Sequence, residues 1–169
     1  MPESFLGREM EQDTATAEQG GEFLTFFLGP EEYAIPILAV KEIAGIQTVT
    51  AVPQAPAYLR GVANLRGTVI PILDLRSWFQ MESRPDTEET CVIVLHRREQ
   101  TVGVVVDRVW EVRGIPEEDI VDAPSLTQAQ GMKGILGIGK SRERVTLLLK
   151  MDALPLSSTP ENPRYLKKQ

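Results

Sequence analysis

Short apolar segments separated by turn-forming residues run through this 169-residue chain and restrict its fold more than any other feature. They are rich in valine and isoleucine and are bounded by glycine, proline or charged residues. Such segments are typical of strands and hairpins in a sandwich or barrel, whereas helices need a longer periodic pattern. The sequence therefore predicts a mainly β protein with short helices, whose strands lie at residues 23–28, 33–37, 62–65, 68–73, 91–95, 101–106 and 145–150.

Two seven-residue segments resemble each other. Val-Lys-Glu-Ile-Ala-Gly-Ile at 40–46 matches Val-Trp-Glu-Val-Arg-Gly-Ile at 109–115, and each follows a pair of strand-like runs. Coincidence among common β-protein residues is the alternative, but the similar order of the flanking runs favours a duplicated unit. Two small β-barrels packed together would fit, because barrel closure removes exposed sheet edges. We expect a first barrel at about 22–80 and a second at about 88–155, with any exchange of strands between them left open.

Composition and charge exclude several classes of protein. Lys plus Arg number 18 against 24 Asp plus Glu, giving a net charge of −6, and an acidic chain repels nucleic acid. The only cysteine, Cys91, suits a reducing compartment and excludes a disulfide within the chain and a multi-cysteine metal site. The N-terminus lacks the apolar core of a secretory signal, and no apolar run is long enough for a membrane helix. We expect a cytoplasmic protein.

The two ends of the chain differ from its middle. Residues 1–21 carry few large apolar groups and no periodicity, so we expect a disordered N-terminal arm. Residues 156–169 contain two prolines and end in Lys-Lys-Gln, and we expect this tail to fray. From the start at Met1 and the absence of receiver or kinase motifs, we expect a complete single-module protein and not a fragment of a longer kinase or fusion protein.

Signs of catalysis are scarce in the sequence. The one histidine, His96, lies in a charged turn, where a solvated loop residue is the ordinary interpretation. The chain has no Gly-x-Ser-x-Gly elbow and no His-Glu-x-x-His motif. We therefore expect no catalytic residue, no metal site and no cofactor.

One motif argues for a different function. Residues 134–141, Gly-Ile-Leu-Gly-Ile-Gly-Lys-Ser, match the P-loop pattern of nucleotide-binding proteins. A working P-loop needs a strand before it and a helix after it, because loop amides and the helix N-terminus hold the phosphates. Here residues 125–133 are polar, and the run at 145–149 is strand-like. We expect these glycines to permit tight turns and close strand approach, and a P-loop nucleotide-binding protein remains a remote alternative.

Several segments resemble the CheW family. The most specific is Gly-Val-Ala-Asn-Leu-Arg-Gly at 61–67, followed by Pro-Ile-Leu-Asp-Leu-Arg at 71–76. Glu-Glu-Tyr-Ala-Ile at 31–35 and Val-Gly-Val-Val-Val-Asp at 102–107 match as well. The resemblance covers about residues 22–155 and implies two packed SH3-like five-stranded β-barrels that share a core and have no catalytic activity.

The resemblance also implies a groove that binds the chemoreceptor. Its residues in this chain are Ile37, Val40, Glu42, Arg66 and Cys91. Glu42 and Arg66 could pair and hold the turn and the groove together, although an ordinary exposed turn residue is the alternative for Arg66, and Val40 suits the core equally well. Cys91 stands where relatives tend to carry valine, and a buried thiol can replace a small apolar side chain.

A separate surface is implied for the kinase. The first barrel's loop at about residues 49–58, together with Arg60 just after it, supplies the candidate residues Val49, Ala51, Pro53, Tyr58 and Arg60. Arg60 stands where relatives often carry lysine, which preserves the charge but changes the bonding geometry.

Together these features imply a non-catalytic adaptor for chemotaxis. It would couple the cytoplasmic tips of chemoreceptors (methyl-accepting chemotaxis proteins) to the regulatory domain of the histidine kinase CheA, without inserting into the membrane. The main alternative is a CheW-like adaptor in a receptor–kinase pathway with another output, such as surface motility.

Overall fold

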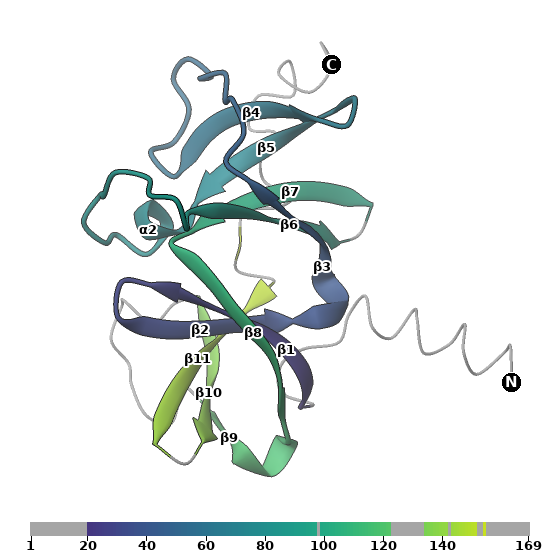
Figure 1. Ribbon diagram of the computed structural model, residues 1–169, viewed down its shortest axis with the longest axis vertical. Coiled ribbons are helices and arrows are strands. Elements are labelled where there is room, and N and C mark those ends of the chain that lie inside the picture. Colours follow the sequence, from purple (N-terminus) through teal and green to yellow (C-terminus); the bar gives the residue numbers. More distant parts are fainter. Residues whose placement is uncertain (1–19, 98, 123–133, 142, 152–153, 155–169) are drawn as a thin grey trace, which may run out of the picture.

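The computed structural model describes residues 20–97, 99–122, 134–141, 143–151 and 154 (Figure 1). The tail predicted at 156–169 and all but residues 20 and 21 of the predicted N-terminal arm lie outside the described residues.

The described chain is built mainly from strands, connected by tight turns and three short helical segments. One α-helix, α2, and two 3₁₀ turns, η2 and η3, accompany them. In chain order the elements are β1 (Gly21–Leu28), β2 (Glu31–Pro36), η2 (Ile37–Ala39), β3 (Val40–Gly45), β4 (Leu59–Leu65), β5 (Thr68–Asp74), α2 (Leu75–Trp78), β6 (Cys91–Arg97), β7 (Gln100–Val106), β8 (Arg108–Ile115), η3 (Glu117–Asp119), β9 (Ile120–Asp122), β10 (Ile135–Ser141) and β11 (Arg144–Leu149).

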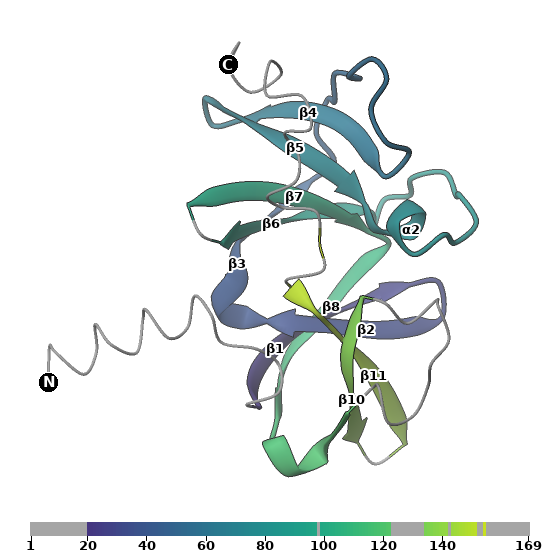
Figure 2. The ribbon, with the colours of Figure 1, turned by 180° about the vertical axis from the view of Figure 1, so that it is seen from behind.

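The strands form two sheets, one above the other in Figures 1 and 2. The six-stranded sheet has the order β8-β1-β2-β11-β10-β9, and the five-stranded sheet has the order β3-β6-β7-β5-β4. Each sheet therefore takes strands from both 22–80 and 88–155, so these consecutive ranges do not correspond to the two sheets. The physical reason is an exchange of hairpins: β1–β2 joins the later strands, while β6–β7 joins the earlier ones.

The two sheets repeat the same plan. In each, a hairpin pairs on one side with an antiparallel strand of the internal repeat, β3 or β8. On its other side the hairpin pairs in parallel with the last strand of a second hairpin, as β2 with β11 and β7 with β5. This arrangement supports the duplication read from the sequence, and the prediction of a mainly β protein with two packed SH3-like barrels is confirmed.

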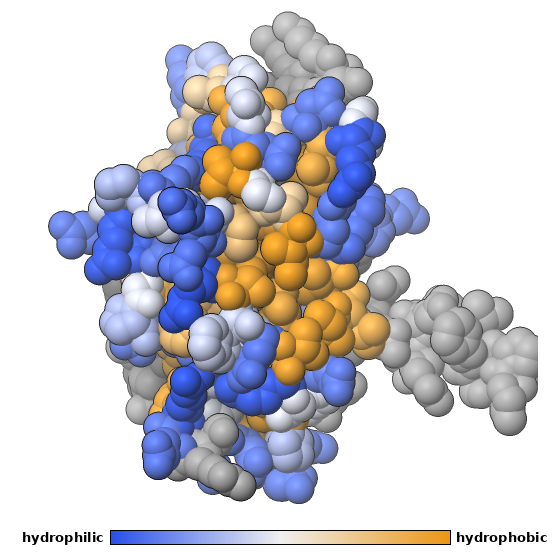
Figure 3. Space-filling model, in the orientation of Figure 1, coloured by the Kyte–Doolittle hydropathy of each residue, from blue (hydrophilic) through white to orange (hydrophobic). Residues whose placement is uncertain are grey.

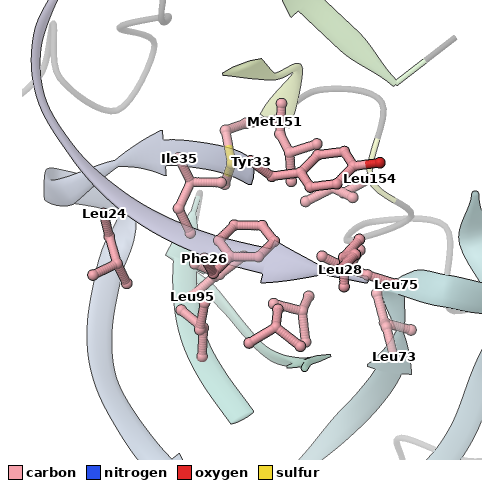
Figure 4. Packing of buried hydrophobic residues seen from close by; sticks show 14 of the residues in the cluster. Leu24, Phe26, Leu28, Tyr33, Ile35, Leu73, Leu75, Leu95, Met151 and Leu154 are labelled. Atoms are coloured by element: carbon pink, nitrogen blue, oxygen red, sulfur yellow. The ribbon is translucent and has the colours of Figure 1, made fainter. Parts of the chain in front are cut away.

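Three apolar clusters hold the fold together because neighbouring residues in a strand point to opposite faces of the sheet. In β6, Val92 and Val94 point into a cluster of the five-stranded sheet, whereas Ile93 and Leu95 point into the large cluster between the sheets. A third cluster, which includes Phe23 and Ala34, lies on the six-stranded sheet alone. Figure 4 shows side chains from both sheets meeting in the large cluster, which we call the inter-sheet core.

Two glycines allow strands to approach closely at equivalent places. Both follow a register shift, Gly61 in β4 and Gly137 in β10. A Cβ atom on Gly61 would lie 2.1 Å from the Thr50 carbonyl oxygen, and one on Gly137 would lie 3.0 Å from the Val121 carbonyl oxygen. The glycines of the P-loop pattern thus lie in and before strand β10, which turns directly into strand β11 instead of a helix.

A charged network joins α2 to the turn between β1 and β2. Asp74 accepts hydrogen bonds from the backbone N–H groups of Arg76 and Ser77, and so begins α2. The nearly buried Arg76 side chain then pairs with Asp107, through Nε–Oδ1 at 2.9 Å, and Asp107 accepts the Gly29 N–H at 2.7 Å. Burial raises the pKa of Asp107, but the bonds from Arg76 and Gly29 outweigh it and lower the pKa.

Candidate protein-binding surface

Strand β3 contains a β-bulge that brings apolar residues onto one face. Val40 pairs with Leu95 and Ile43 pairs with Ile93, so three steps along β3 match two steps along β6. Residues directly opposite each other in paired strands point to the same face. Because Leu95 and Ile93 both point into the inter-sheet core, Val40 and Ile43 also face the other sheet.

Strand β8 repeats this bulge. Val109 pairs with Phe26 and Val112 pairs with Leu24, again three steps against two. The Thr25 hydroxyl lies opposite the bulge, accepting a hydrogen bond from the Glu111 N–H at 3.2 Å and donating one to its carbonyl oxygen at 3.0 Å. Phe26 and Leu24 belong to the inter-sheet core, so Val109 and Val112 face it as Val40 and Ile43 do.

These matched strands leave an exposed apolar surface on one side of the molecule. Figure 3 shows a band of apolar side chains over η2, β3 and part of β8. Leu38, Ile43 and Val112 are 61%, 46% and 53% exposed, which is unusual for large apolar side chains gathered on one face. We call this surface the apolar band: the exposed Leu38, Ile43 and Val112 with the partly buried Ile37, Val40, Cys91 and Val109.

Cys91 lies where the two halves of the band meet. It pairs with Gly45 at the end of β3, and the Val109 backbone N–H of β8 hydrogen-bonds its thiol. Burial raises the pKa of the Cys91 thiol, and the bond from Val109 opposes this only in part. The half-buried thiol is therefore protonated at neutral pH and acts as a small apolar group.

Glu42 points away from the band toward the tip of the β4–β5 hairpin. It pairs with Val94, whose side chain belongs to the other face of the sheet. Its carboxylate accepts hydrogen bonds from Arg66, with Nη2–Oε1 at 2.8 Å, and this interaction lowers the pKa of Glu42. The structure thus places Ile37, Val40 and Cys91 against the inter-sheet core, with Val40 and Cys91 at opposite ends of the β3–β6 pairing. The Glu42–Arg66 pair lies on the other face of this sheet.

The five residues predicted to face the kinase have different environments. Ala51 and Pro53 are exposed in the segment between β3 and β4, whereas Val49 packs against the apolar cluster of the five-stranded sheet. Tyr58 is half-buried and makes an edge contact with Trp78, at 5.2 Å between ring centroids.

Arg60 has carboxylate partners within the chain. Its Nε lies 3.1 Å from Asp74 Oδ2, and its Nη1 and Nη2 form a two-pronged contact with Asp86 at 3.2 and 3.0 Å. Hydrogen bonding to Asp86 raises the already high pKa of Arg60. Arg60 therefore holds the segment after α2 against β4, and its guanidinium is less available to a partner than the exposed Ala51 and Pro53.

Sequence reasoning missed three members of the band. Leu38, Ile43 and Val112 are the most exposed of its residues, yet simple alternation would place Val40 and Ile43 on opposite faces of a strand. A signal was present in the internal repeat, because Val40 and Ile43 correspond to Val109 and Val112. Matched apolar pairs spaced by three residues in two otherwise polar strands indicate a bulge.

Other kinds of site find little support in the part of the chain that the structure describes. It contains no group of three or more histidine, cysteine, aspartate or glutamate side chains that could hold a metal ion. No helix among residues 20–97, 99–122, 134–141, 143–151 and 154 is long and apolar enough to cross a membrane.

Comparison with known proteins identifies the family. A model of the CheW-like domain matches residues 22–157. The chain belongs to the CheW family. The chemotaxis protein CheW of Klebsiella aerogenes is 41% identical over 135 residues, covering 80% of this chain and 81% of that protein. The crystal structure of the scaffolding protein TtCheW from Thermoanaerobacter tengcongensis superposes with a TM-score of 0.72 at 29% identity, covering 78% of this chain and 89% of that one.

The family match extends to relatives with other names. Protein FrzA of Myxococcus xanthus is 29% identical over 144 residues, which cover 82% of this chain and 90% of FrzA. The relatives of this chain therefore include proteins named for chemotaxis and proteins with other names.

Proposed function

We propose that this protein is a non-catalytic CheW-type adaptor of chemotaxis, which couples the cytoplasmic tips of chemoreceptors to the histidine kinase CheA. The observation that carries the proposal is the apolar band, built by two matched bulged strands, one in each sheet. Family membership supports the same role, since relatives of similar length are named as chemotaxis and scaffolding proteins.

The band fits an α-helical partner. Apolar residues of an amphipathic helix recur every three or four positions and can lie along an apolar surface of this kind. Ile43 from β3 and Val112 from β8 would contact such a helix from its two sides, while Cys91 and Val109 lie between them. We assign receptor binding to the band, with Glu42 and Arg66 at its edge.

The kinase would bind elsewhere, on the segment between β3 and β4. Ala51 and Pro53 expose their side chains there, while Val49, Tyr58 and Arg60 shape the segment from beneath through the contacts described above. Two separate surfaces allow one adaptor to bind both partners at once. Linked weak contacts then raise the overall avidity of an array through effective concentration.

The main alternative is the same adaptor chemistry in a receptor–kinase pathway with another output. The match to FrzA, which is not named as a chemotaxis protein, supports this alternative pathway. Pull-down with the chemoreceptors and kinases of the same cell decides between them, because only cognate partners should be recovered.

A pair of valine variants tests the receptor-binding role of the band. Val112→Lys places a charge in the band, whereas Val145→Lys places one on β11, three strands away in the same sheet. The two valines are 53% and 60% exposed, so both variants should fold alike. We expect Val112→Lys to reduce co-sedimentation with receptor cytoplasmic fragments by about tenfold or more, and Val145→Lys to leave it near the wild-type level.

Folding measurements on the two variants show whether a loss of receptor binding reflects a loss of structure. Circular dichroism and thermal unfolding of both variants should match the wild type, because both valines lie at the surface. Wild-type receptor binding by a folded Val112→Lys protein would show that the band is not the receptor site.

A further inference from the structure

A second surface lies on the face of the six-stranded sheet turned away from the apolar band. Phe27 follows Phe26 in β1, so its side chain points away from the inter-sheet core. The Phe27 ring makes an edge contact with Trp110, at 5.7 Å between centroids. The Arg108 guanidinium lies over both rings, at 4.4 Å from the centroid of Phe27 and 4.9 Å from that of Trp110. Arg144 lies over the Trp110 ring at 5.7 Å.

The guanidinium groups of Arg108 and Arg144 are only partly neutralised by carboxylates of the described residues. Within the described residues, Arg108 has no carboxylate within ion-pair distance, and its orientation is set by the two rings. Arg144 lies 3.8 Å from the buried Glu32. However, Glu32 is already engaged by Arg113 at 3.1 Å and by the Thr146 hydroxyl at 2.9 Å. We call Phe27, Arg108, Trp110 and Arg144 the cation–aromatic surface.

Such a surface fits a segment that carries carboxylates together with apolar side chains. Guanidinium groups donate paired hydrogen bonds to carboxylates, and the exposed Trp110 ring offers an apolar contact. The chain supplies such a segment at residues 1–19, which contain five acidic residues and only one basic residue. Its apolar side chains lie among the acidic ones: Phe5, Leu6 and Met10.

The segment is long enough to reach the surface. It joins the described chain at Gly20, while Phe27 lies at the other end of β1, about 23 Å away along a strand. Glu9 precedes Gly20 by eleven residues, and eleven residues reach about 36 Å when extended. Because both groups belong to one chain, the contact forms at an effective concentration of about millimolar, so a weak interaction is enough.

We propose that residues 1–19 bind the cation–aromatic surface of the same molecule, through their carboxylates and the apolar side chains among them. This contact would leave both proposed partner surfaces uncovered, since the apolar band lies on the opposite face of the six-stranded sheet and the segment between β3 and β4 pairs with the five-stranded sheet. It would occupy the surface in the free protein and keep other acidic segments away from it.

Tryptophan resonances of the full-length protein test the proposal. The chain has two tryptophans, so each indole N–H gives one assignable peak in a nitrogen–proton NMR spectrum. Trp110 lies in the surface, and Trp78, which packs against Tyr58, serves as the internal reference. The test variant is Glu9→Lys/Glu11→Lys, and the matched control is Glu88→Lys/Glu89→Lys in an exposed loop.

We expect the Trp110 peak to move in the test variant and to move in the same direction when wild type is placed in 0.5 M salt, because salt screens exposed charge pairs. The control variant and the Trp78 peak should not show this movement. An unchanged Trp110 peak in the test variant, or an equal movement in the control, would overturn the proposal. A movement that depends on protein concentration would also overturn it, since the segment would then bind a second copy.

Discussion

Arg66 and Glu42 join the two outer strands of the five-stranded sheet. Glu42 belongs to β3 at one edge, and Arg66 follows β4 at the other edge. Arg66 Nη2 lies 2.8 Å from Glu42 Oε1, and the Arg66 side chain is otherwise 75% exposed. The pair therefore connects the two edge strands, β3 and β4, which share no backbone pairing. The rest of the Arg66 guanidinium remains exposed at the surface.

Reversing the charge at Arg66 should weaken receptor binding without unfolding the protein. In Arg66→Glu, two carboxylates would repel each other at the edge of the apolar band. We expect a loss of receptor co-sedimentation of about tenfold or more. The thermal unfolding midpoint should stay near that of wild type, because exposed ion pairs contribute little to stability.

Arg66→Asn is the appropriate control for the turn. Arg66 and Gly67 have φ values of +55° and +87°, the pattern of a two-residue turn in which asparagine is favoured at the first position. Arg66→Asn keeps the turn and removes only the charge, so we expect intermediate receptor binding. Receptor recruitment equal to wild type by the folded Arg66→Glu protein would remove Arg66 from the binding site.

The local parts of the fold could be predicted from the sequence, because turn residues act over a few positions. Gly29-Pro30 and Arg66-Gly67 separate runs that form the hairpins β1–β2 and β4–β5. The parallel pairing of β2 with β11 joins Glu32 to Thr146 across most of the chain. No short pattern encodes that pairing, so the exchange of hairpins between the two halves could not be derived.

The candidate site could also be predicted only in part. Family resemblance placed Glu42 beside Arg66, and the structure shows that contact. The roles of Ile43 and Val112 depend on bulges, which become visible only when the register of each strand against its neighbour is known.

Gly61→Ala should destabilise the protein strongly. A Cβ atom at this position would lie 2.1 Å from the Thr50 carbonyl oxygen, and the backbone φ is +146°. Either the bridge between Thr50 and Val62 breaks or the strands move apart. We expect a loss of about 3 kcal/mol in the free energy of unfolding, measured by urea denaturation.

Gly67→Ala separates backbone strain from steric overlap. Gly67 also has a positive φ, of +87°, but nothing lies within 4 Å of its added Cβ. This variant should lose only about 1 kcal/mol. Equal losses at the two positions would show that the contact with Thr50 does not limit β4.

Cys91 should react slowly with alkylating reagents. Burial raises its thiol pKa, and the thiolate is the reactive form. At pH 8 we expect iodoacetamide to modify the native protein more slowly than the urea-unfolded protein. Bound receptor fragment should slow the reaction further, whereas reaction of native Cys91 at the unfolded rate would contradict its placement in the band.

The Arg76–Asp107 pair should make stability depend on pH in the acid range. The folded-state pKa of Asp107 lies below its ordinary value, which is about 3.9 for an unperturbed aspartate. Its contribution is therefore complete above about pH 5 and is lost as pH falls through the folded pKa. Asp107→Asn leaves the nearly buried Arg76 without its counter-ion, and since Asp107 itself is 31% exposed, we expect a loss of about 2 kcal/mol at pH 7.

Urea denaturation of wild type and Asp107→Asn at pH 7, 5 and 3 measures this dependence. The stability difference between the two proteins should persist from pH 7 to 5 and narrow toward pH 3, because protonated Asp107 no longer pairs with Arg76. Glu88→Gln, at an exposed loop position, should follow wild type at every pH. A difference that stays constant down to pH 3 would mean that Asp107 acts through the shape of its hydrogen bonds to Arg76 and Gly29 and not through its charge.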